Sequence, residues 1–157
     1  MKPKRIMCAV DFSEPAELAS NYALELARTL GAELVLLHAF DRPADYGHAG
    51  QTHPADSGLV DRLDMVLAAV TDVPISRVLH AGTPGEVIVW AAADQNCDLI
   101  VVGTHGRTGF KHLLLGSVAE YVVSHARVPV LTVRQQQANE PAPPEPRVEP
   151  APAPRYM

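Results

Sequence analysis

The stretch "RIMCAVDFSEPAELASNYALELARTLGAELVLLHAF" (residues 5–40) decides the fold, because it reads as a strand, a helix and a second strand in succession. Its first apolar run predicts a buried strand over Arg5–Asp11. Ser13 can cap the helix that follows, and Gly31 predicts where that helix ends. A second buried strand is predicted over Glu33–Phe40. The apolar residues of the helix fall on one face, which comprises Leu18, Ala19, Tyr22, Ala23, Leu26, Ala27 and Leu30.

The same alternation continues through the rest of the domain. Further strands are predicted over Ile75–Ala81, Asp98–Gly103 and Val128–Arg134. Continuous apolar strands separated by amphipathic helices indicate a parallel sheet that is covered on both faces. Right-handed crossovers then give a doubly wound, Rossmann-like α/β fold of five strands in the order 3-2-1-4-5.

Helices fill the intervals between these strands. Thr83 with Glu86 predicts the start of a helix that runs to about Asn96, and Ser117 with Glu120 predicts the start of another. A helix is also expected where apolar residues recur at Leu59, Val60, Leu63, Val66, Leu67 and Val70.

Two segments differ in composition from this pattern. Residues 41–58 are polar and predict a loop. Residues 135–157 carry seven of the chain's 14 prolines and few apolar side chains, so they predict a Pro-rich disordered tail behind a domain of residues 1–134. The tail is either an inert solvated segment or a ligand for a groove that binds extended proline-rich chains.

Composition excludes several classes of function. The net charge of -5 argues against a general nucleic-acid binder or a polybasic membrane binder. No apolar stretch approaches the roughly 18 residues of a membrane span, and the apolar run near the start is too short for a signal peptide. With only two cysteines there is no disulfide framework, so a cytoplasmic location is expected.

The stretch "GTHGRTGFKHLLLGSV" (residues 103–118) is glycine-rich and cationic, and it follows the fourth strand. Its spacing is Gly103-x2-Gly106-x9-Gly116-Ser117, which matches neither a Walker A loop nor a Gly-x-Gly-x-x-Gly motif. In a sheet of this order, ligands bind where the winding reverses, between strands one and four. Asp11 ends strand one, so it is expected across that crevice.

Two interpretations of this stretch stay open on spacing alone. In the first, the free amides and dipole at the helix N-terminus bind phosphate, with Arg107 adding positive charge, and Asp11 accepts hydrogen bonds from ribose. In the second, Gly103 and Gly106 only make turns, and Ser117 only caps a helix.

Four segments carry a resemblance to the universal stress protein family: "VDFSEPAELA", "LLHAF", "GTPGEVIVWAA" and "DLIVVGTHGRTGFKHLLLGSVAEYVVSHARVPVLTV". The resemblance covers about residues 2–134, and the glycine spacing is that of the family's ATP-binding branch. It implies that the protein binds ATP or another adenine nucleotide, with Mg²⁺ as a plausible companion. It also implies a homodimer formed by the last strand, through Val130, Leu131, Thr132 and Val133.

The resemblance assigns roles to individual positions. Asp11 would contact the ribose, Ala9 would line the pocket beside it, and the backbone of Ala39 would meet the adenine edge. The phosphate end would be held by Gly116, Ser117, Val118 and Ala119. The ribose and phosphates would be wrapped by Gly103, Thr104, His105, Gly106, Arg107, Thr108 and Gly109.

The sequence suggests no resident metal and no dedicated catalytic base. The seven histidines show neither His-x3-His spacing nor a Cys-x2-Cys partner, so solvated or capping histidines are expected.

The motif and the resemblance leave three candidate functions: a nucleotide-dependent signalling module with an unknown protein partner, a nucleotide-independent stress or chaperone-like protein, and a slow ATPase. The intact glycine motif favours the first, and the missing base limits any ATP hydrolysis to a slow rate.

Overall fold

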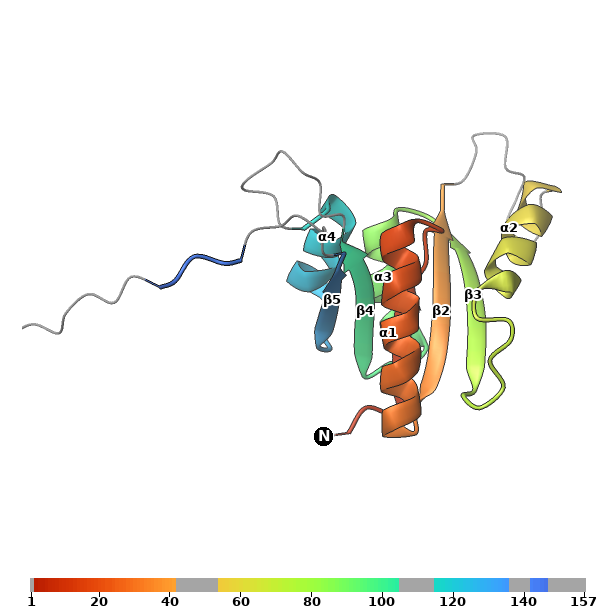
Figure 1. Cartoon of the computed structure of the whole chain (residues 1–157). Coiled ribbons are helices and arrows are strands. Elements are labelled where there is room, and N and C mark those ends of the chain that lie inside the picture. The colour runs from red at the N-terminus through yellow and green to blue at the C-terminus, as the bar shows by residue number, and fades with distance from the viewer. Residues whose placement is uncertain (1, 42–53, 105–114, 136–141, 147–157) are drawn as a thin grey trace, which may run out of the picture.

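Four helices and five strands alternate along the chain of the computed structural model, which describes residues 2–41, 54–104, 115–135 and 142–146. The five strands form one parallel sheet in the order β3-β2-β1-β4-β5, so the predicted fold class and strand order are confirmed (Figure 1). The elements are β1 (Arg5–Ala9), α1 (Glu14–Leu30), β2 (Glu33–Phe40), α2 (Pro54–Met65), β3 (Ile75–Ala81), α3 (Pro84–Asp94), β4 (Leu99–Thr104), α4 (Ser117–His125) and β5 (Val130–Arg134).

Two apolar layers hold the helices against the sheet. Side chains of α1 and α2 form one layer with alternate residues of the central strands, and side chains of α3 and α4 form the other. Figure 1 shows α1 in front of the sheet and α3 behind it. The middle residues of β1, Ile6, Met7 and Cys8, are fully buried. This explains the uninterrupted apolar run, because a central strand covered on both faces has no solvent-facing positions.

The buried face of α1 differs from the predicted one. Tyr22 was expected in the core, but 57% of its surface is exposed. The buried face is turned toward smaller residues, namely Pro15, Ala16, Ala19, Ser20, Ala23, Leu24 and Ala27. Small side chains let the helix axis lie close to the sheet, so a tyrosine is displaced to the edge of the contact.

Several element boundaries also differ from the sequence prediction. α2 begins at Pro54, inside the predicted loop 41–58, and it ends at Met65 rather than continuing to Val70. Leu67 takes a left-handed φ of 54°, and short backbone hydrogen bonds such as that from the Val66 amide to the Leu63 carbonyl (3.1 Å) turn the chain there. The apolar periodicity continues past Met65, because these turn residues still pack against the core.

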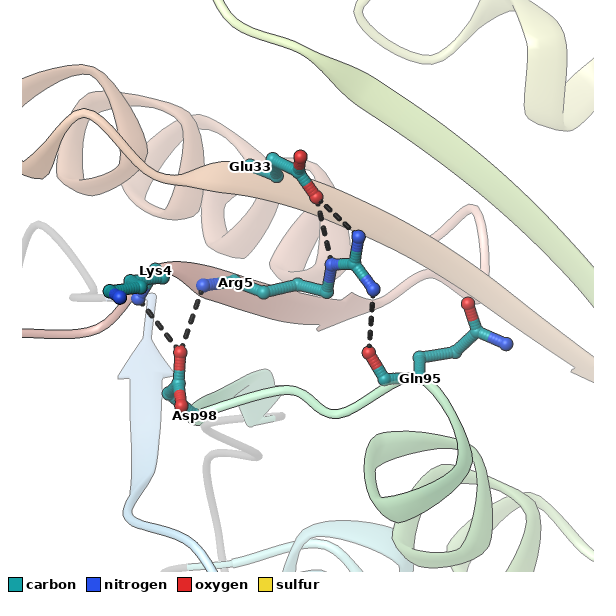
Figure 2. A network of polar contacts seen from close by, with 5 residues as sticks. All are labelled: Lys4, Arg5, Glu33, Gln95 and Asp98. Atoms are coloured by element: carbon teal, nitrogen blue, oxygen red, sulfur yellow. Dashed lines mark hydrogen bonds and ion pairs between the residues drawn. The ribbon is translucent and has the colours of Figure 1, made fainter.

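A polar network fixes the amino end of the sheet. Figure 2 shows the Arg5 guanidinium donating to Glu33 Oε2 at 2.8 and 2.6 Å and to the Gln95 carbonyl at 2.8 Å. The Asp98 carboxylate accepts from the backbone amides of Lys4 (2.8 Å) and Arg5 (3.1 Å). These contacts join β1, β2 and the turn before β4 at the end of the sheet opposite the strand carboxyl ends.

Candidate functional site

A cavity of about 640 Å³ lies at the carboxyl ends of β1 and β4, where the winding of the sheet reverses. This is the size of a site for a small organic ligand, and its position is the one expected for ligands of doubly wound folds. The cavity is lined by Ala9, Val10, Asp11, Ser13, Ala16, Leu37, Ala39, Pro84, Ile88, Val102, Gly103, Leu115, Gly116, Ser117, Val118, Ala119 and Glu120.

The structure brings many of the predicted site residues together around this cavity. Those that line it are Ala9, Asp11, Ala39, Gly103, Gly116, Ser117, Val118 and Ala119. Thr104 does not line it: its side chain is buried, with its hydroxyl 3.5 Å from the Val133 carbonyl oxygen. The predictions for His105, Gly106, Arg107, Thr108 and Gly109 concern positions outside the described residues.

Asp11 is held in place by the start of α1. The Ser13 backbone amide donates to Asp11 Oδ1 at 3.0 Å, and the Ser13 hydroxyl donates to the same oxygen. The Ser13 hydroxyl also accepts from the Ala16 amide at 3.3 Å, which confirms Ser13 as the N-cap of α1. One serine therefore both starts the helix and orients an exposed carboxylate at the cavity wall.

The N-terminus of α4 forms the opposite wall. The N-cap is Gly116, with φ -66° and ψ 161° and no side-chain cap hydrogen bond, and Ser117 is the first helical residue. The predicted capping pair of Ser117 and Glu120 is therefore wrong. Because Gly116 has no side-chain oxygen to accept from them, the first-turn amides of α4 are not engaged by their N-cap residue. Such amides and the helix dipole favour an anion.

The two described glycines of the motif have different surroundings. A Cβ built on Gly103 would lie 2.5 Å from the Pro15 carbonyl oxygen and 2.7 Å from its carbon. Gly103 is therefore required by the close approach of α1 to β4. A Cβ on Gly116 would meet no atom of the described structure within 4 Å. Open space at a cavity wall leaves room for a ligand, and packing gives no reason for glycine there.

The cavity combines few polar groups with an apolar floor. Asp11 and Glu120 are the carboxylates among its lining residues. Within residues 2–41, 54–104, 115–135 and 142–146, no group of three or more His, Cys, Asp or Glu residues could hold a metal ion.

Sequence reasoning missed the apolar lining. Val10, Leu37, Val102, Pro84 and Ile88 line the cavity, but none of them was predicted as a site residue. The sequence could have indicated Val10, Leu37 and Val102 only by their place near the carboxyl ends of predicted strands, where a ligand site is expected. Composition could not distinguish them from ordinary core residues.

Comparison with known proteins places the chain in a family. A model of the universal stress protein family matches residues 2–134, so the chain belongs to that family. A universal stress protein of Thermus aquaticus is 37% identical over 135 residues, covering 83% of this chain and 98% of the relative. The universal stress protein Rv2005c of Mycobacterium tuberculosis is 36% identical over 137 residues, covering 83% of this chain.

The lengths of these relatives differ. The match covers only 45% of the mycobacterial protein, so the chain spans about half the length of that relative. Among solved structures, a universal stress protein in complex with cAMP is 26% identical, with a TM-score of 0.61, and covers 85% of this chain and 98% of its own. In the parts of this chain that the structure describes, no helix has the length and apolar character needed to span a membrane.

Proposed function

We propose that this protein binds ATP or another adenine nucleotide in the cavity between β1 and β4 and acts as a nucleotide-dependent signalling module. The observation that carries the proposal is the pairing of two unlike walls across one cavity of about 640 Å³. On one side Ser13 fixes the Asp11 carboxylate, and on the other the first turn of α4 begins at a glycine without a side-chain cap. Hydroxyls and phosphates of a nucleotide match these two walls.

The parts of the nucleotide follow from this arrangement. The carboxylate of Asp11 accepts hydrogen bonds from ribose hydroxyls, while the backbone of Ala39 meets the adenine edge. The amides of Ser117 and Val118, together with the Ser117 hydroxyl, receive the phosphate end, where the helix dipole is favourable. Mg²⁺ would arrive with a triphosphate and screen it from the Glu120 carboxylate.

The comparisons support the class of ligand. The solved relative in complex with cAMP shares the fold over nearly the whole domain. ATP is proposed over smaller adenine nucleotides because the glycine spacing is that of the family's ATP-binding branch. Signalling requires that the nucleotide bind one conformation better than another, because equal affinity for both would shift nothing.

Hydrolysis is at most slow in this proposal. Of the two carboxylates that line the cavity, Asp11 is held by Ser13 and is assigned to the ribose in this proposal, which leaves Glu120 as the candidate base among the described lining residues. Burial raises the pKa of the Cys8 thiol to about 12, so this thiol stays protonated at neutral pH and is no nucleophile.

The test compares two serines of the same helix. Ser117 and Ser124 both lie exposed on α4, but only Ser117 lines the cavity. We expect Ser117→Ala to weaken ATP binding about threefold to tenfold, because one hydrogen bond to a charged group is lost. Isothermal titration of Mg-ATP, AMP and cAMP against each variant measures this.

Ser124→Ala is the matched control, and it should bind ATP as the wild type does. Both variants should keep the wild-type melting temperature, since neither serine caps α4. A wild-type protein that binds none of the three nucleotides at millimolar concentration would contradict the proposed function. Equal ATP affinity of Ser117→Ala and wild type would contradict the contact between the Ser117 hydroxyl and the phosphate.

The protein is further proposed to form a homodimer through β5. This strand is one edge of the sheet, and the Leu131 side chain is 38% exposed on it. An unpaired apolar edge strand invites pairing with another chain. The dimer is proposed from the family and from this edge strand. A cytoplasmic location and an independent domain over residues 1–134 are proposed from the sequence and the family.

A further inference from the structure

The chain turns from β1 into α1 at Phe12, whose backbone φ is 63°. This left-handed conformation is uncommon for a residue with a bulky side chain, and it persists only where neighbouring groups hold it. Two such groups contact the ring. The imidazole of His38 on β2 lies 4.5 Å away between ring centroids, and the Arg62 guanidinium on α2 lies 4.1 Å from the ring centroid.

Phe12 lies between the two residues that form one wall of the cavity. Asp11 precedes it and Ser13 follows it, and the two are joined by the hydrogen bonds to Asp11 Oδ1. One residue earlier, the Val10 carbonyl accepts a hydrogen bond of 2.6 Å from His38 Nδ1. The path of the chain from Val10 to Ser13 is thus fixed at both ends, and the φ of Phe12 places the Ser13 amide and hydroxyl against Asp11 Oδ1, which orients the carboxylate.

The Phe12 ring is not enclosed on all sides. A second cavity of about 300 Å³ lies beside it, with Arg62, Met65 and Val66 of the α2 region among its lining residues. Among the described residues, Phe12 therefore borders open space on this side. Phe12 also packs against the apolar core layer of α1, and its contacts with His38 and Arg62 hold the ring on its remaining described sides.

We propose that Phe12, held between His38 and Arg62, is a positioning residue that aims the Asp11 carboxylate at the ribose hydroxyls of the bound nucleotide. This inference rests on the proposed function. It adds a requirement: α2, none of whose described side chains lines the nucleotide cavity, controls recognition of the sugar through one ring contact.

The experiment measures discrimination of the sugar. Dissociation constants of Mg-ATP and of Mg-2′,3′-dideoxyATP, which lacks both ribose hydroxyls, are compared for wild type, Asp11→Ala and Phe12→Asn. Wild type should prefer ATP, and Asp11→Ala should bind the two nucleotides alike. Asparagine tolerates left-handed backbone but lacks the ring. Phe12→Asn should therefore fold and lose at least about threefold of the preference.

A second pair of variants keeps the test decisive if Phe12→Asn does not fold. Arg62→Gln removes the exposed cation from the ring, and Arg127→Gln removes an exposed arginine before β5 as a control. Arg62→Gln should lower the preference for ATP about twofold or more, and Arg127→Gln should not. A wild-type ratio in folded Phe12→Asn, or in Arg62→Gln where Phe12→Asn is unfolded, overturns the inference.

The same data separate the two proposals. If wild type binds neither nucleotide, the proposed function fails and this inference fails with it. If wild type prefers ATP, Asp11→Ala loses the preference and Phe12→Asn retains it, the proposed function stands and the positioning role of Phe12 is refuted.

Discussion

At the scale of single residues, two glycines of one motif serve different ends. Gly103 is required by the backbone of Pro15, and Gly116 borders open space at the cavity. A motif that reads as one ligand-binding signal in sequence therefore contains at least one packing requirement. The distinction rests on the position of α1, which lies far from both glycines in sequence.

A substitution tests this difference. Gly103→Ala places a methyl group where the Pro15 carbonyl oxygen lies 2.5 Å away, so α1 or β4 must shift. We expect a loss of roughly 1–3 kcal/mol in the free energy of unfolding, which is typical of overpacking. Urea denaturation followed by circular dichroism measures it.

Gly116→Ala is the matched control for stability. Its φ of -66° suits any residue, and no described atom lies within 4 Å of the added Cβ. Its unfolding free energy should stay within about 0.5 kcal/mol of wild type. Equal unfolding free energies of the two alanine variants would contradict a packing requirement that is specific to Gly103.

At the scale of elements, the two ends of the sheet have separate tasks. The carboxyl ends of β1 and β4 form the cavity, whereas the amino ends are tied by Arg5, Glu33 and Asp98 (Figure 2). The side-chain hydrogen bond with Glu33 raises the pKa of Arg5. Stability placed at the far end of the sheet leaves the carboxyl end available for a ligand.

Asp98 gives this clamp a pH dependence. Hydrogen bonds from the backbone amides of Lys4 and Arg5 hold its pKa below the ordinary value of 3.8. A carboxyl whose pKa is lowered by folding contributes stability above its unfolded pKa, and that stability is lost as the pH falls through the folded pKa. Asp98→Asn should therefore melt at a lower temperature than wild type at pH 7, and the difference should shrink below about pH 4.

Calorimetry from pH 3 to pH 7 measures this trend, and Asp61→Asn on the exposed side of α2 serves as the control. The control should show no comparable loss at pH 7. A melting difference between Asp98→Asn and wild type that persists unchanged at pH 3 would mean that the carboxylate charge does not contribute to the clamp.

At the scale of the whole molecule, the sheet ends in two different strands. β5 forms one edge and carries the exposed Leu131, while β3 forms the other. Leu131→Lys should convert the proposed dimer to a monomer, because a charge placed on an edge strand opposes edge-to-edge pairing. Sedimentation velocity at several concentrations measures the change.

The control lies on the opposite edge. Ser76 is an exposed residue of β3, and Ser76→Lys should leave the assembly unchanged. A monomeric wild-type protein, or a Leu131→Lys variant that stays dimeric, would contradict pairing through β5.

Sequence patterns predicted the architecture well, because burial of a parallel sheet on both faces demands long apolar runs. Three strand ranges illustrate the limit: Glu33–Phe40 and Ile75–Ala81 match in full, whereas the predicted strand Arg5–Asp11 ends at Ala9. The predicted end of the first strand was wrong because Val10 is as apolar as a strand residue and is buried, with 5% of its surface exposed. Periodicity reports burial, and burial continues past the point where the strand ends.

The sequence by itself determined the order of strands and helices, the crevice between β1 and β4, and the family. The hydrophobic period is a local property and suffices for the order of elements, whereas the family followed from the resemblance of four longer segments. Only the tertiary structure decided that Gly103 serves the packing of α1, that Gly116 begins α4 without a side-chain cap, and that Phe12 turns left-handed against Arg62. Each of these depends on the distance or orientation of groups that folding alone brings together.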